Sequence, residues 1–77
     1  MHTQDTGALD AGARRVLVGH GNDPQRLAAL VHDLRQLRDE ADRVAYGEPS
    51  PEALWAYRRA ARELAEAERA LALAGGA

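Results

Sequence analysis

The sequence has no cysteine, no lysine, no phenylalanine and no isoleucine, and two of these absences exclude kinds of chemistry. Without cysteine the chain has neither disulfide bonds nor thiolate zinc sites. A chain of 77 residues therefore needs regular helix packing or a second chain for stability. Without lysine there is no Schiff-base chemistry and no amine general base.

An excess of positive charge is also missing. Ten arginines stand against twelve acidic residues, which gives a formal net charge of -2. No apolar run approaches the roughly 20 residues that span a bilayer. The first ten residues, MHTQDTGALD, lack the basic-then-apolar order of a signal peptide. We therefore expect a cytoplasmic protein, of bacterial or phage origin, with no membrane partner.

Two segments begin with the same signal, a side-chain acceptor followed by proline. Asp23 precedes Pro24, and Ser50 precedes Pro51. The acceptor caps the free amides of a helix, and proline at the first helical position loses no hydrogen bond. The two signals predict helices over about residues 24–46 and 51–74.

The break between the two helices is short and contains Gly47 and two prolines. We expect Gly47 to end the first helix in the left-handed conformation, and the prolines to prevent its continuation. Because the connection is short, the two helices must be antiparallel neighbours. The predicted architecture is all-α: a helical hairpin over residues 23–77, preceded by an arm over residues 1–22.

Large apolar residues recur in both helices at steps of three and four, the spacing of a coiled-coil seam. The predicted core or dimer seam consists of Leu27, Leu30, Leu34, Leu37, Val44, Tyr57, Leu64 and Leu71. Alanine recurs every seventh residue in the second helix, which lets a neighbouring backbone approach closely. The seams are wider than one helix pair needs, so we expect two chains to form a four-helix bundle.

The arm is less regular than the hairpin. A short helix is predicted over residues 7–18, with Gly19 as its stop, and the rest of the arm is expected to be partly flexible. A strand formed by the letters RVLV is the alternative. Nothing else in one chain could pair with such a strand, so the helix is the prediction.

Trp55 is the residue most indicative of a binding site, because it falls on the side of its helix opposite Tyr57. An outward tryptophan followed by arginines has the composition of a binding hot spot. The predicted partner-binding residues are Trp55, Arg58, Arg59 and Arg62. In the alternative interpretation, Val16 and Leu17 of the arm fold over Trp55. The small size of the protein favours this alternative, because an exposed apolar side chain tends to be covered.

Metal and catalytic sites are not indicated. The histidines at positions 2, 20 and 32 do not have the spacing of metal ligands, and no cofactor motif is present. No polar residue lies on a seam facing a cavity, where a positioned acid–base pair would be needed. We therefore expect no metal, no cofactor and no enzymatic activity.

Three functions remain, in order of preference. The first is a small non-catalytic protein-binding module, such as an adaptor, an accessory subunit or a contact inhibitor or regulator of another protein. The alternative is a dimeric nucleic-acid-binding protein that uses the arginines of the last helix. A small all-helical enzyme is the third.

Overall fold

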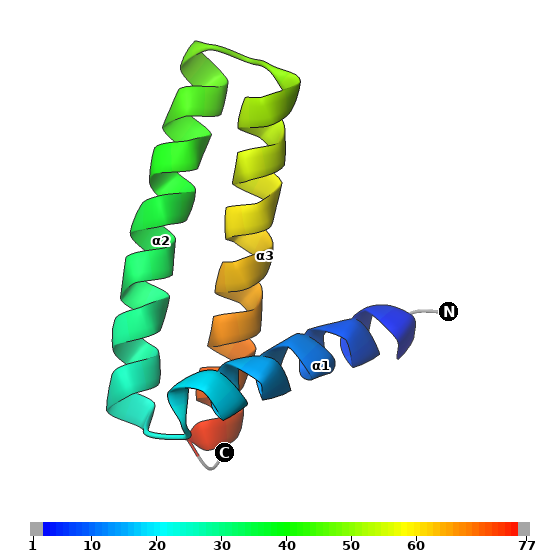
Figure 1. The fold of residues 1–77 in the computed structure, drawn as a ribbon, viewed down its shortest axis with the longest axis vertical. Coiled ribbons are helices and arrows are strands. Elements are labelled where there is room, and N and C mark those ends of the chain that lie inside the picture. The colour runs from blue at the N-terminus through cyan, green and yellow to red at the C-terminus, as the bar shows by residue number, and fades with distance from the viewer. Residues whose placement is uncertain (1–2, 76–77) are drawn as a thin grey trace.

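A computed structural model of the protein describes residues 3–75. It contains α1 (Thr3–His20), α2 (Pro24–Gly47) and α3 (Pro51–Ala74). No strand occurs within this range, so the all-helical prediction is confirmed. Helices α2 and α3 lie side by side and antiparallel, and α1 crosses the open end of this hairpin (Figure 1). We call the end with the α2–α3 connection the closed end.

Both hairpin helices begin at the caps that their sequences predict. The Asp23 carboxylate accepts a hydrogen bond of 3.0 Å from the backbone N–H of Gln25. The Ser50 hydroxyl accepts one of 3.0 Å from the N–H of Ala53. Each cap satisfies an amide that has no partner within its helix, and proline follows at the first turn.

The end of α2 differs from the expectation for Gly47. This glycine stays within the helix, and Gly21 is the only residue with a positive φ in the described part of the chain. The N–H of Glu48 still bonds to the carbonyl of Val44 at 2.9 Å, and Glu48 then leaves the helix with φ of -136°. The prediction of a left-handed stop at Gly47 is therefore wrong, because Glu48, with a negative φ, makes the turn.

Helix α1 is longer than the predicted 7–18, since it spans Thr3–His20. The letters RVLV lie inside it, so the strand alternative is wrong. Gly19 does not end the helix. The end is made by Gly21, whose φ of 80° is left-handed and whose N–H bonds to the carbonyl of Leu17 at 2.7 Å.

The buried residues all lie at the open end of the hairpin. One cluster consists of Ala13, Leu27 and Ala70, and joins the three helices. A second cluster, Val31, Leu64 and Ala67, lies between α2 and α3. No residue from position 32 to position 63 is buried. The closed end of the hairpin therefore has no core of its own.

Helix α1 is held on α3 by a close approach and by ion pairs. Gly12 is buried against the side chain of Glu66, where a Cβ atom would collide with that side chain. The Glu66 side chain is only 13% exposed and lies 4.0 Å from Arg15. Further along, Arg69 donates a 2.8 Å hydrogen bond to Asp10. These contacts place α1 on the last turns of α3.

The close approach at Gly12 gives a first prediction. Alanine at an exposed helical glycine is expected to stabilise the protein by up to about 1 kcal/mol, because alanine is the better helix former. Gly7 has no atom near the added Cβ, so Gly7→Ala is expected to raise the melting temperature. At Gly12 the added Cβ must displace Glu66, so Gly12→Ala is expected to show no gain or a loss. Thermal unfolding followed by circular dichroism compares the two; equal gains would contradict the crossing geometry.

Candidate functional site

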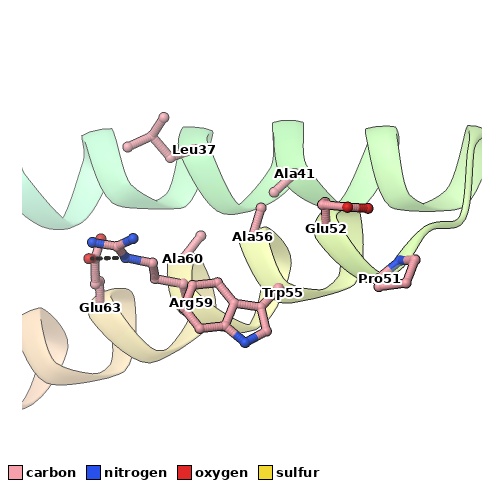
Figure 2. Close-up of a pocket in the computed structure, with 9 residues that line it drawn as sticks. All are labelled: Leu37, Ala41, Pro51, Glu52, Trp55, Ala56, Arg59, Ala60 and Glu63. Atoms are coloured by element: carbon pink, nitrogen blue, oxygen red, sulfur yellow. Dashed lines mark ion pairs between the residues drawn. The ribbon is translucent and has the colours of Figure 1, made fainter.

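An apolar groove of about 570 Å³ lies between α2 and α3 at the closed end of the hairpin. Figure 2 shows its lining, with α2 on one side and α3 on the other. The lining residues are Leu37, Ala41, Pro51, Glu52, Trp55, Ala56, Arg59, Ala60 and Glu63. We refer to this surface as the groove.

Small residues form the middle of the groove and large ones form its edges. Ala56 and Ala60 point from α3 toward α2, and Ala41 lies across from them (Figure 2). Leu37 stands at the α2 edge and is 58% exposed, while Trp55 stands at the α3 edge and is 67% exposed. Trp55 and Leu37 therefore add exposed apolar surface to the two edges of the alanine-lined groove.

Only part of the predicted seam lies in the interior of this single chain. Leu27 and Leu64 are buried. Leu30, Leu34, Tyr57 and Leu71 are half-buried. Leu37 and Val44 are exposed, so they lie outside the core of the hairpin and stay predictions as dimer-seam residues.

A different line of α2 faces α3. Val31, Arg38 and Ala45 are seven residues apart, and each is less exposed than the seam residue directly before it in the sequence. Those seam residues are Leu30, Leu37 and Val44. Val31 was missed by the seam prediction, although its spacing of four from Leu27 fits the same period. The apolar stripe of α2 is therefore wide, with one edge against α3 and the other edge, at Leu37, along the groove.

One ion pair joins α2 to α3 outside the groove, and a second pair lies beside it within α2. Arg35 bonds to Glu68 of α3 at 3.2 Å. Next to it, Arg38 bonds to Asp39 at 3.0 Å, and this hydrogen bond raises the pKa of the Arg38 guanidinium further above its usual value. Arg38 therefore stays charged at every physiological pH, although it lies along the helix pair.

The four predicted partner-binding residues divide into two groups. Trp55 and Arg59 line the groove, and Arg59 forms a 3.5 Å ion pair with Glu63 (Figure 2). Arg62 lies outside the groove and forms a 3.4 Å pair with Glu66, beside α1. Arg58 is exposed and also lies outside it. The structure thus places Trp55 and Leu37 at opposite edges of one groove, a relation that the sequence did not indicate.

The interpretation in which the arm covers Trp55 is wrong. Val16 and Leu17 pack on the cluster around Leu27 at the open end of the hairpin. The connection from residue 21 to residue 23 is short and keeps the end of α1 beside the start of α2. From there α1 crosses α3 instead of running along the hairpin (Figure 1). Trp55 accordingly stays 67% exposed.

The groove and α1 share one face of the hairpin. A more polar hollow of about 310 Å³ lies where α1 meets the hairpin, between Val16 on α1 and Leu30 and Leu34 on α2. Glu63 lines both this hollow and the groove, so the two adjoin. Helix α1 therefore covers one end of the face, and the groove is the end that α1 leaves uncovered.

Residues 3–75 show no cluster of three or more potential metal ligands. Among the helices of that range, none has both the length and the apolar character to cross a bilayer. Comparisons of the chain with protein-family models, with curated proteins and with solved structures gave no match.

Proposed function

We propose that this protein is a small non-catalytic protein-binding module, acting as an adaptor, an accessory subunit or a contact inhibitor of another protein. The observation that carries this proposal is the groove, an apolar surface with Trp55 and Leu37 exposed at its edges. No side chain of the described chain covers it.

The shape of the groove suits a helix of another chain. It follows the two helices that form it, and an amphipathic helix binds such a groove by placing an apolar face on its floor. Alanines at positions 41, 56 and 60 permit close backbone approach. Trp55 supplies the large, rigid contact area that is typical of hot spots, with Arg59 and Glu52 at the polar rim.

Self-association is part of the proposal. A hairpin with an open apolar face completes a four-helix bundle when two copies meet. We therefore propose a homodimer, in addition to a partner protein. The cytoplasmic location and the bacterial or phage origin stay predictions from the sequence.

Nucleic-acid binding is less well supported. Two of the arginines that would contact phosphates, Arg59 and Arg62, are already paired with Glu63 and Glu66. A phosphate would have to displace these carboxylates or lie next to them, which opposes binding. The apolar character of the groove also has no role in such a function.

Affinity capture from the host cell tests the proposal. Tagged wild-type protein is expected to retain a specific protein that Leu37→Asp loses, because a buried unpaired carboxylate at the groove edge opposes docking. Val18→Asp is the matched control, since Val18 is 87% exposed on α1 and away from the groove. Mass spectrometry identifies what each bait retains.

Two outcomes would contradict the proposal. One is an identical set of proteins on the wild type and on Leu37→Asp. The other is loss of the captured protein from Val18→Asp as well, which would indicate binding through α1. Both variants change exposed residues, so circular dichroism is expected to show the helical content of the wild type for each.

A further inference from the structure

The floor of the groove consists of small side chains, which determines the kind of occupant that fits it. Ala41 of α2 lies opposite Ala56 and Ala60 of α3. Their methyl groups leave a volume of about 570 Å³ open between the two helices. Large apolar side chains of an occupant fill such a space, whereas a second surface of small side chains would leave part of it empty. The groove therefore favours a stripe of large residues such as leucine or phenylalanine.

The groove has the length of a short helix. Its lining along α3 runs from Pro51 to Glu63, which is roughly 18 Å at a rise of 1.5 Å per residue. A helix of about three turns matches this length. Such a helix buries one face against the alanines and leaves the opposite face in water, so the occupant is amphipathic.

The closed end of the hairpin, beside the groove, is acidic. Residues 40–56 contain four carboxylates and one arginine, which gives this segment a net charge of -3. The arginine, Arg43, is paired with Glu40 at 3.0 Å. The other three carboxylates have no ion-pair partner within residues 3–75, and they belong to Asp42, Glu48 and Glu52.

The helix ends do not offset this charge. The C-terminus of α2 and the N-terminus of α3 both lie at the closed end (Figure 1). The partial charges of these two helix ends have opposite signs and largely cancel. The side chains therefore set the sign of the electrostatic potential at this end, and that sign is negative.

Glu52 extends the negative charge into the groove itself. It lies in the lining next to Pro51, at the closed end (Figure 2). At the other end of the lining, Arg59 and Glu63 form an ion pair and offset each other. Glu52 is thus the charged lining residue that lacks an ion-pair partner in the described chain. A basic residue of an occupant gains a partner here, and an acidic residue is repelled.

From the alanine floor and the acidic closed end we propose that the groove binds a basic amphipathic helix of another protein. The helix is about three turns long, places large apolar side chains on the alanines and sets a lysine or an arginine against Glu52. This inference rests on the proposed function, because it names the chemistry of the partner for the same groove. The attraction between the basic helix and the closed end also speeds their encounter, and it declines as the salt concentration rises.

The fluorescence of Trp55 measures occupancy of the groove, because Trp55 is the only tryptophan of the chain and lines the groove. Three synthetic peptides of about 15 residues share one stripe of leucine and phenylalanine, contain no tryptophan, and carry lysine, glutamine or glutamate at all other positions. A bound peptide covers the indole and shifts its emission to shorter wavelength. We expect the lysine peptide to bind about tenfold more tightly than the glutamate peptide at low salt, with the glutamine peptide between them. Equal affinities, or no shift with any peptide up to about 1 mM, would overturn the inference.

Glu52→Gln separates the attraction at the groove from the net charge of the whole protein. We expect this variant to bind the lysine peptide about two- to fivefold more weakly and the glutamine peptide as the wild type does. Asp33→Asn is the matched control, because it removes the same charge from an exposed position of α2 outside the groove lining. An equal loss of affinity in both variants would show that Glu52 has no particular role, which contradicts the proposed site.

The capture experiment distinguishes a failure of this inference from a failure of the proposed function. A captured protein that Leu37→Asp loses, and that Glu52→Gln binds more weakly than the wild type, supports both. A captured protein that Leu37→Asp loses, but that Glu52→Gln binds as tightly as the wild type, supports the proposed function and overturns the basic helix. An indole that is already covered in the protein alone, and that the lysine peptide leaves unchanged, would show that a second copy occupies the groove instead.

Discussion

Leu27→Ala is expected to lower the free energy of unfolding by about 2–5 kcal/mol. Leu27 is the one large side chain in the described chain that is fully buried, and its cluster joins all three helices through Ala13 and Ala70. Truncation removes its buried methyl groups and leaves a cavity that helices of this length cannot close by a small shift. A domain of this size has a total stability of about 4–12 kcal/mol, so the loss is a large part of it.

Urea denaturation followed by circular dichroism measures this loss. Leu73→Ala is the matched control, because it makes the same chemical change at a site that is 46% exposed. We expect the control to lie within about 0.5 kcal/mol of the wild type. Similar midpoints for the two variants would show that the cluster around Leu27 does not hold the helices together.

Ala67→Leu is the second substitution with a large expected effect. Ala67 has no exposed surface and lies with Val31 and Leu64 between α2 and α3. A leucine at this position has no space without separation of the helices or displacement of their side chains, which costs about 1–3 kcal/mol or more. We expect a lower melting temperature and weaker docking of α2 on α3.

Ala72→Leu provides the comparison on the same helix, because Ala72 is exposed. Both substitutions add the same side chain and differ little in helix propensity, so a difference in melting temperature reports packing alone. A melting temperature for Ala67→Leu equal to that of the control would mean that the two helices are further apart than the structure has them.

The helix starts could be predicted because their signals are local. The side chains of Asp23 and Ser50 each bond to an amide two or three residues away, so a few letters of sequence contain the whole interaction. The end of α2 depended instead on the conformation of Glu48, which many residue types can adopt. No residue type at this position therefore predicts where α2 ends, and the expected signal, Gly47, lies inside the helix.

The face of α2 that meets α3 could not be chosen from the sequence. Leu30 and Val31 are neighbours on the helix, and both fit steps of three and four from Leu27. Either line of residues could face α3. The choice depends on the shape of the opposite surface, where Leu64 and Ala67 receive Val31.

The crossing of α1 had no local signal either. Gly12 packs against the side chain of Glu66, and Asp10 accepts a hydrogen bond from Arg69, which is 59 positions away in the sequence. Trp55 was recognised from its composition and position, but the groove around it was not. The groove is formed by residues of both α2 and α3, and the periodicity of one helix does not show which residues of the other lie beside it.

A core confined to one end gives the molecule two levels of local stability. Helix α1 and both buried clusters hold the open end together, so this end unfolds only when the whole chain unfolds. The closed end can unfold locally, from the connection at Glu48 inward, while the open end stays folded. This segment contains Trp55 and Leu37, so the part of the chain that we propose to bind a partner is also the part that can adapt its shape.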